Sequence, residues 1–188
     1  TLLPMSAVIR EVLGERPLSV MSGPTIALEV ANGAPAAVVV ASREPGAATL
    51  AQELFMTERF RVYTGDDVTG VELGGSVKNV IAIASGACDA MGFGTNAKAA
   101  LLTRGLTEIA RLGMAMGGAR DTFYGLSGLG DLATTCMSPY SRNRWLGEEI
   151  GKGKPLAAIL KETTMVVEGV ATAQSTHDLA VKHRVEMP

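Results

Sequence analysis

The sequence contains 188 residues, of which 47% are hydrophobic, 19% are charged and only 4% are aromatic, a composition typical of a soluble globular protein with an aliphatic core. A formal net charge of −2, a pI near 5.7 and the lack of a basic cluster exclude a nucleic-acid-binding surface, so we predict no nucleic-acid partner. The longest apolar runs are too short to cross a bilayer and no signal peptide is recognisable, so we predict no membrane insertion. The two cysteines lack the density of a secreted disulfide scaffold, which predicts a cytoplasmic protein.

The first third of the chain alternates between helical and strand patterns. We predict helices over residues 2–10, 24–30 and 45–56, and strands over residues 18–21, 36–41 and 60–64. The uninterrupted apolar run 36–41 is typical of a strand that is covered on both faces. The backbone N–H groups of residues 23–27, at the start of a predicted helix, are expected to form an anion site. This alternation indicates an α/β organisation.

Helical patterns without strands follow the aspartate pair at residues 66 and 67. Two long helices, over residues 71–91 and 96–116, are predicted to form an antiparallel hairpin. Further helices begin after Ser141 and at residue 172. We therefore predict an α/β domain over residues 1–66 and an all-α domain over residues 67–188, the second incomplete at its C-terminus.

The helix predicted over residues 71–91 has two faces of different chemistry. One face is expected to be buried core and carries Val77, Val80, Ile81, Ala84 and Cys88. The neighbouring face carries one cation, Lys78, among the small or apolar residues Val71, Gly74, Gly75, Ala82 and Ser85. Consecutive glycines inside a helix cost about 1 kcal/mol each relative to alanine, so they indicate that a backbone or a ligand packs there. On this stretch alone Lys78 is either functional or a solvated surface lysine.

The glycine-rich segment at residues 125–133 contains Gly128, Gly130 and Ala133 at the spacing of a dinucleotide-binding fingerprint. That fingerprint requires a preceding strand and a following helix within a strand-helix-strand unit, and a helical region precedes it here, so we reject the match. Asp131 lies in this segment, which we interpret as a turn. Its carboxylate either orients a lysine or binds a hydroxyl, or it caps the next helix.

Ser141, Arg142 and Asn143 stand at a predicted helix start, where a guanidinium and backbone N–H groups suit a phosphate. A solvated helix cap is the alternative. Glu168 is expected in a loop between helices. Metal-ligand spacing is absent from the two cysteines and the two histidines, so we predict no metal site. We interpret Cys88 and Cys136 as reduced structural cysteines, and His177 and His183 as surface residues.

Six motifs occur along the chain in the order SGPTIA, VELGGSVKN, NAKAALLTRG, GLSGLGDL, SRNR and VVEG. Together they resemble bacterial NAD(P)-dependent glycerol-3-phosphate dehydrogenase over nearly the whole chain. The resemblance implies the later part of a Rossmann-type dinucleotide-binding domain, followed by a helical substrate domain of the 6-phosphogluconate-dehydrogenase-like type. It also implies interconversion of sn-glycerol 3-phosphate and dihydroxyacetone phosphate with NAD or NADP, supply of glycerol 3-phosphate for phospholipid synthesis, a phosphorylated small-molecule substrate and a homodimer.

The resemblance assigns the proton acceptor to Lys78. It assigns substrate contacts to Gly23, Thr25, Lys78, Asp131, Ser141, Arg142 and Asn143, and cofactor contacts to Ala27, Arg142, Val166 and Glu168. A neutral Lys78 would take the proton of the C2 hydroxyl as hydride leaves C2 for the nicotinamide, and its ammonium would protonate the alkoxide in the reverse direction. Burial or a nearby cation would favour the neutral amine.

The chain departs from the family pattern at its start. The cofactor fingerprint, the first strands and a second functional lysine of the family lie upstream of Thr1, so we expect that this piece alone does not bind NAD(P) productively. Ile26 replaces a common phenylalanine. Two alternatives remain, namely a related lysine-based hydroxyacid dehydrogenase, whose anion site would recognise a carboxylate, and a non-catalytic helical interaction module with a partner covering the Lys78 face.

Overall fold

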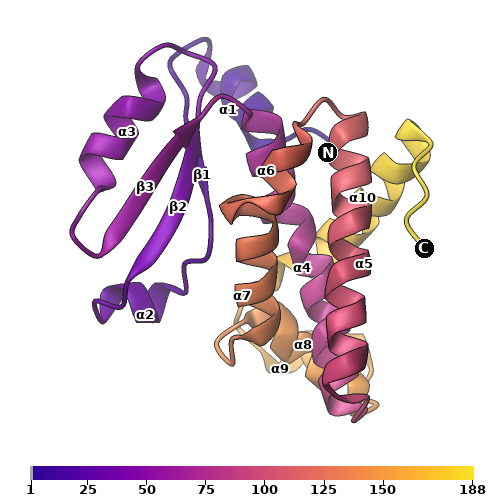
Figure 1. Ribbon diagram of the computed structural model, residues 1–188. Helices are drawn as coiled ribbons and strands as arrows, with labels where there is room; N and C mark the ends of the chain where they lie inside the picture. Colours follow the sequence, from indigo (N-terminus) through magenta and orange to yellow (C-terminus); the bar gives the residue numbers. More distant parts are fainter. Residues whose placement is uncertain (1) are drawn as a thin grey trace.

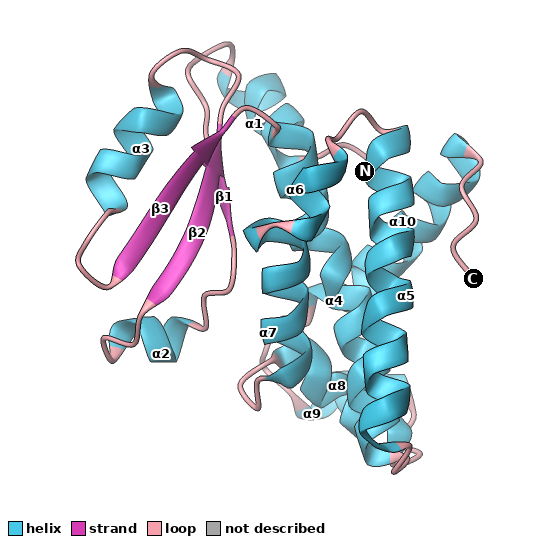
Figure 2. Ribbon diagram, in the orientation of Figure 1, coloured by secondary structure: helices cyan, strands magenta, loops and turns pink. Residues whose placement is uncertain are grey.

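The computed structural model describes residues 2–188 and contains a small sheet with three helices, followed by a larger group of helices (Figure 1, Figure 2). The strands are β1 (Val20–Ser22), β2 (Ala36–Ala41) and β3 (Phe60–Gly65), in the spatial order β1-β2-β3. β1 runs antiparallel to β2, with Ser22 opposite Val39, and β3 runs parallel to β2. The helices of this part are α1 (Met5–Leu13), α2 (Ala27–Ala31) and α3 (Ala47–Phe55).

β2 is the middle strand and is covered on both faces, as its apolar run predicts. Val38 and Val40 pack with Val62 and with α3 on one face. Ala41 and the partly buried Val39 pack on the other face, against the first turn of the long helix that follows the sheet. The alternation of side chains along a strand sends successive residues to these two faces.

The rest of the chain is helical within the described residues. Its elements are α4 (Val68–Ala90), α5 (Gly94–Ala115), α6 (Arg120–Tyr124), the π-helical turn η1 (Leu126–Gly130), α7 (Asp131–Met137), α8 (Arg142–Gly151), α9 (Leu156–Glu162) and α10 (Glu168–His183). The fold therefore follows the predicted order, α/β and then all-α, and α4 and α5 form the predicted hairpin (Figure 1). Among residues 2–188, no helix combines the length and apolarity needed to span a membrane.

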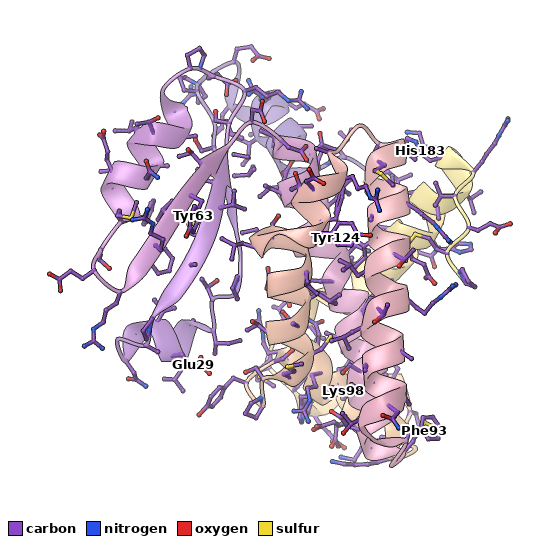
Figure 3. The ribbon with its side chains drawn as sticks, viewed as in Figure 1. Glu29, Tyr63, Phe93, Lys98, Tyr124 and His183 are labelled. Carbon is purple, nitrogen blue, oxygen red and sulfur yellow. The ribbon has the colours of Figure 1, made fainter. Side chains whose placement is uncertain are left out.

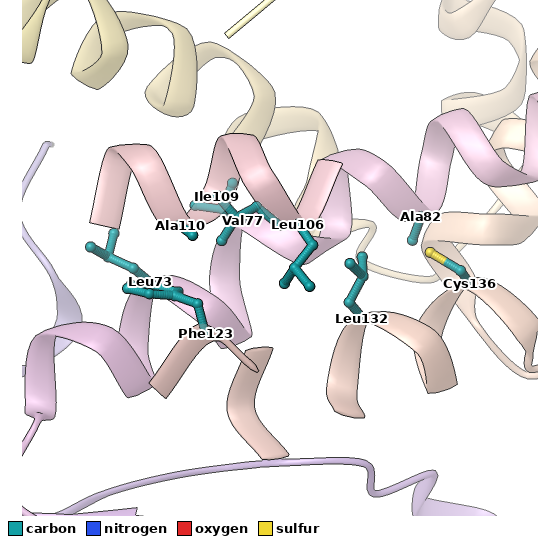
Figure 4. Close-up of a cluster of buried hydrophobic side chains, with 9 residues drawn as sticks. All are labelled: Leu73, Val77, Ala82, Leu106, Ile109, Ala110, Phe123, Leu132 and Cys136. Atoms are coloured by element: carbon teal, nitrogen blue, oxygen red, sulfur yellow. The ribbon is translucent and has the colours of Figure 1, made fainter. Parts of the chain in front are cut away.

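α4 is the central helix, because it packs against the sheet, α5, α7, α8 and α10. Leu73 and Val77 of α4 enter the main core together with Leu106 and Ile109 of α5 and the fully buried Phe123 of α6 (Figure 4). On another side, α8 approaches so closely that a Cβ at Gly86 would stand 1.9 Å from the carbonyl oxygen of Arg144. A side chain at that crossing would force the two helix backbones apart.

Several predicted boundaries are wrong for identifiable reasons. α4 begins at Val68 rather than residue 71, because Asp67 Oδ1 accepts a hydrogen bond of 2.8 Å from Gly70 N and caps the helix. α1 begins at Met5, after Pro4 at its N-cap, rather than at residue 2. α2 begins at Ala27 rather than residue 24 and has only five residues, so of the N–H groups of residues 23–27 that were expected to form an anion site only that of Ala27 belongs to a helix.

Two segments that we predicted as irregular are helical. The glycine-rich segment is not a turn, because η1 runs directly into α7 and Asp131 is the first residue of that helix. Glu168 is likewise the first residue of α10 and not a loop residue. The side chain of Asn143 anchors this helix start, because its Oδ1 accepts a hydrogen bond of 2.8 Å from the backbone N–H of Gly169.

The prediction of the buried face of α4 is also partly wrong. Val77 and Cys88 are buried, but Val80 and Ile81 are only half-buried and Ala84 is exposed. The face that carries Lys78 is the more deeply covered one, because Val71, Gly74, Ala82 and Ser85 are all buried there. Small residues on this face allow η1, α7 and α8 to pack close to the helix axis.

Candidate active site

Lys78 lies in the middle of α4, and its amine is held by two side chains of α7. Nζ donates to Asp131 Oδ1 at 2.5 Å and to Thr135 Oγ1 at 2.9 Å. The side chains of Lys78 and Asp131 are 15% and 10% exposed, so this is a largely covered ion pair. The interpretation of Lys78 as a solvated surface lysine is therefore wrong.

The carboxylate of Asp131 joins three elements. Thr135 Oγ1 donates to Oδ1 at 3.2 Å, while Ser22 Oγ, at the end of β1, donates to Oδ2 at 3.1 Å. The Thr135 hydroxyl can accept from Lys78 and donate to Asp131 at the same time, since a hydroxyl has one donor and two acceptor positions. Lys78, Thr135 and Asp131 thus form a closed hydrogen-bonded triangle, and Ser22 ties it to the sheet.

Two glycines of α4 allow this approach. A Cβ at Gly74 would stand 2.7 Å from the carbonyl oxygen of Ser127 in η1, and a Cβ at Gly75 would stand 2.5 Å from Ser22 Oγ. The expectation that a backbone or a ligand packs on this surface is met by the backbone of η1 at Gly74 and by the Ser22 side chain at Gly75. The glycines are therefore needed to bring β1, η1 and α7 onto the Lys78 face.

The structure decides whether Asp131 caps a helix or uses its carboxylate for another contact. It is not an N-cap, because it is the first residue of α7 and the preceding position, Gly130, has no capping side chain. The carboxylate instead pairs with Lys78, as the lysine-orienting interpretation has it, and also accepts hydrogen bonds from the hydroxyls of Ser22 and Thr135. The Lys78 side chain is thus largely covered, as one of the two expectations has it, but the nearest charge to its amine is an anion and not a cation.

The loop after β1 passes beside this cluster. Gly23 has φ of +153° and lies so close to β2 that a Cβ would stand 2.8 Å from the carbonyl oxygen of Ala37. Thr25 is exposed, and its Oγ1 donates to the carbonyl oxygen of Gly23 at 3.1 Å. Pro24 lies against Gly130, immediately before Asp131, at 3.4 Å from the position of a Cβ there. Two predicted substrate positions therefore adjoin the Lys78 cluster.

Arg142 and Glu168, both predicted at the cofactor, meet in an ion pair between the first turns of α8 and α10. Their side chains are 44% and 42% exposed. The neighbouring Ser141 and Asn143 are buried and engaged in the fold, since Ser141 Oγ caps α8 by accepting from Arg144 N at 3.2 Å and Asn143 holds the start of α10. The structure thus brings Ser141, Arg142, Asn143 and Glu168 together.

The other predicted cofactor positions lie on the surface. Val166 is 68% exposed in the connection between α9 and α10, two residues before Glu168. Ala27 is exposed at the start of α2, which belongs to the sheet part. Among residues 2–188, no hydrogen bond or ion pair joins Ala27 to the residues of α8 and α10.

Sequence reasoning missed two members of the Lys78 cluster, Ser22 and Thr135. Thr135 could have been found, because it follows Asp131 by four residues and therefore lies on the same face of a helix. The interpretation of this segment as a turn hides that signal. Ser22 offers no comparable signal, since its contact with Asp131 spans 109 positions of the chain.

The two cysteines stay apart from this chemistry. Both are free and buried, and burial raises the pKa of the Cys136 thiol to about 11, although a hydrogen bond from Ser85 opposes the shift. His177 is exposed, whereas His183 is half-buried at the end of α10 (Figure 3). The prediction of surface histidines is therefore correct for His177 and only partly correct for His183.

The chain is similar to known dehydrogenases in both sequence and structure. Residues 1–48 match the family model for the N-terminus of NAD-dependent glycerol-3-phosphate dehydrogenase, and residues 67–188 match the model for its C-terminus. Two curated relatives, NAD(P)+-dependent glycerol-3-phosphate dehydrogenases from Salinibacter ruber and Carboxydothermus hydrogenoformans, are each 54% identical over 100% of this chain and 56% of their own length. The crystal structure of glycerol-3-phosphate dehydrogenase from Coxiella burnetii has a TM-score of 0.95 at 44% identity and covers 100% of this chain and 57% of its own. The chain thus spans just over half the length of the relatives that it matches.

Proposed function

The chain belongs to the NAD-dependent glycerol-3-phosphate dehydrogenase family, and from this membership we propose that the full-length protein interconverts sn-glycerol 3-phosphate and dihydroxyacetone phosphate with NAD or NADP. The observation that carries the proposal is the covered ion pair of Lys78 with Asp131, completed by Thr135. Such a group can deliver a proton to, or take one from, an oxygen placed beside it.

Lys78 is the proposed proton donor and acceptor at the C2 oxygen of the substrate. An ammonium has three N–H donors, and Asp131 and Thr135 accept two of them, so the third is left for the substrate oxygen among the partners recorded in residues 2–188. In the reducing direction this N–H protonates the alkoxide that the carbonyl oxygen at C2 becomes. A bound NAD(P)H supplies the hydride that reaches C2 from the nicotinamide.

Arg142 is the proposed anchor for the substrate phosphate. Its guanidinium is nearly half exposed and stands at the first turn of the ten-residue α8, where helix geometry leaves backbone N–H groups without partners inside the helix, apart from Arg144 N, which Ser141 caps. A phosphate can replace Glu168 as its partner. Ser141 and Asn143 are proposed substrate contacts. Within the fold each uses its side-chain oxygen as an acceptor, so the hydroxyl hydrogen of Ser141 and the amide NH₂ of Asn143 can donate to the substrate.

The residues proposed at the cofactor suit a dinucleotide that crosses the molecular surface. Ala27 and Val166 are exposed and offer small or aliphatic contacts, while the half-exposed Arg142 and Glu168 offer a charge and hydrogen-bonding groups. Gly23 and Thr25 are proposed substrate contacts beside the Lys78 cluster. These assignments rest on matched positions and on the exposure of each side chain.

Further proposals concern the whole protein. We propose that the later part of a dinucleotide-binding domain ends at residue 66 and that a substrate domain begins at residue 67, between the end of β3 at Gly65 and the start of α4 at Val68. A cytoplasmic homodimer that supplies glycerol 3-phosphate for phospholipid synthesis is proposed from the family alone.

The proposed function is tested on the full-length protein by following NADH and NADPH oxidation with dihydroxyacetone phosphate. Dihydroxyacetone, which lacks the phosphate, is the matched control, and a 3-oxoacid tests for a hydroxyacid dehydrogenase. We expect kcat/KM for dihydroxyacetone phosphate to exceed that for dihydroxyacetone at least about 100-fold, because two charge-assisted hydrogen bonds contribute about 1.5–3 kcal/mol each. Preference for the oxoacid, or no turnover with any substrate, would contradict the proposal.

A further inference from the structure

Ser22 is fixed by the sheet. Its backbone pairs with Val39 of β2, and Gly23 follows against the backbone of the same strand. Because the strand sets the backbone on one side and the close approach of Gly23 sets it on the other, the direction of the Ser22 side chain is determined by the sheet. That side chain points to the helical part, where its Oγ lies 3.1 Å from Asp131 Oδ2.

The two oxygens of Asp131 have different partners. Oδ1 accepts from Lys78 and Thr135, both in helices, whereas Oδ2 accepts from Ser22 in β1. The terminal torsion of an aspartate is broad, so a carboxylate held through one oxygen can rotate. A hydrogen bond to the second oxygen opposes that rotation. Ser22 therefore keeps Oδ1 facing Lys78.

Gly75 provides the space that Ser22 occupies. A Cβ at this position would stand 2.5 Å from Ser22 Oγ, 3.3 Å from Ser22 Cβ and 4.0 Å from Asp131 Oδ2. The hydroxyl thus sits between α4 and the carboxylate, in a gap that alanine would close. The pairing of a glycine in α4 with a serine in β1 is consistent with a contact made for the hydroxyl and not only for packing.

We propose that Ser22 is a positioning residue of the dehydrogenase site, whose hydroxyl holds Asp131 so that the Lys78 amine stays directed at the C2 oxygen of the substrate. The inference rests on the proposed function. Ser22 immediately precedes Gly23 and Thr25, the proposed substrate contacts of the sheet part. Its hydrogen bond therefore also fixes these contacts relative to the proton donor on α4.

The test uses the full-length protein with Ser22→Ala, which removes the hydroxyl, and Ser22→Thr, which retains it. Ser19→Ala is the matched control, because Ser19 lines the same cavity of about 330 Å³ between α1, β1 and α4. We expect Ser22→Ala to lower kcat about 10- to 100-fold, the range of one hydrogen bond to a charged group, and to leave KM for NADH unchanged. Ser22→Thr should recover most of kcat, and Ser19→Ala should match the wild type.

A double-mutant cycle with Asp131→Asn separates positioning from packing. If Ser22 acts through the carboxylate, Ser22→Ala costs little further kcat in the Asp131→Asn background. Where turnover of that background is too low to follow, the same cycle is measured on the dissociation constant of glycerol 3-phosphate. Equal effects of Ser22→Ala in both backgrounds, unchanged kcat in Ser22→Ala, or equal losses in the alanine and threonine variants would overturn the proposal. Absence of wild-type turnover would instead refute the dehydrogenase function, and the role of Ser22 would fall with it.

Discussion

Replacing Gly74 by alanine tests whether the glycines of α4 exist for close packing. In an open helix this change stabilises the protein by about 1 kcal/mol, because alanine has the higher helix propensity. Here the new Cβ would stand 2.7 Å from the carbonyl oxygen of Ser127 and 3.1 Å from its carbonyl carbon, both backbone atoms of η1. Backbone cannot turn aside as a flexible side chain can, so η1 must shift.

The magnitude follows from two opposing contributions. Overpacking costs about 1–3 kcal/mol, and the gain in helix propensity offsets about 1 kcal/mol of it. We therefore expect Gly74→Ala to lower the free energy of unfolding by up to about 2 kcal/mol. Since η1 leads directly into Asp131, we also expect kcat for dihydroxyacetone phosphate to fall at temperatures where the variant remains folded.

Urea unfolding and steady-state kinetics of the full-length protein measure both effects. Ser76→Ala is the control, because Ser76 is exposed on the same helix two residues further on and already carries a Cβ. It should leave kcat unchanged and stability equal or slightly higher. A Gly74→Ala variant that is more stable than the wild type and fully active would refute the close-packing argument.

Two further predictions concern groups outside the Lys78 cluster. Cys136 should react with a thiol reagent at pH 7–8 only after unfolding, because it is fully buried and its pKa is raised to about 11; rapid labelling of Cys136 in the folded protein would contradict this. Burial raises the pKa of the Asp89 carboxyl, but hydrogen bonds from Lys98 and Arg144 outweigh the effect of burial and hold this pKa below its ordinary value of 3.8. The ionised carboxylate therefore stabilises the fold above pH 3.8, and this stabilisation is lost as the pH falls through the lowered pKa. Urea unfolding should accordingly show that Lys98→Met is less stable than the wild type at neutral pH and that the difference narrows below about pH 3.8; a difference independent of pH would contradict it.

The order of elements was predictable because it rests on local patterns. The apolar run of β2 and the hydrophobic repeats of α4 and α5 were sufficient to predict α/β followed by all-α, and the fold class is confirmed by the dehydrogenase structures, which combine a Rossmann-type domain with a helical one. The strand β2 begins and ends at the predicted residues. Helix ends were less predictable, since the start of α10 depends on a hydrogen bond that Gly169 N donates to the distant Asn143 Oδ1.

The candidate site was predictable only in part. Gly74 and Gly75 mark Lys78 in the sequence, because their cost within a helix requires a compensating contact. The sequence does not reveal what makes that contact, and the backbone of η1 occupies a surface that a ligand could equally have used. The buried face of α4 was misjudged for the same reason, since small residues pack helices closely even when they contribute little hydrophobic area.

Residues matched through the family differ in how the fold uses them. Asp131 and Lys78 meet directly, and Arg142 and Glu168 form an exposed pair. Asn143 is buried and holds α10, a structural role that its motif did not indicate. Tertiary contacts between distant segments decide these roles, and no local pattern encodes them.

The central claim is that Lys78 exchanges a proton with the substrate during hydride transfer. Lys98 offers a matched control, because it is 19% exposed and paired with Asp89 but lies near the start of α5 (Figure 3). The most direct measurement is NADH oxidation with dihydroxyacetone phosphate by full-length Lys78→Met and Lys98→Met, with NADH binding followed separately. We predict that Lys78→Met loses at least about 100-fold in kcat, the scale of general acid catalysis, while both variants bind NADH and Lys98→Met keeps its turnover. Undiminished turnover of Lys78→Met would contradict the claim.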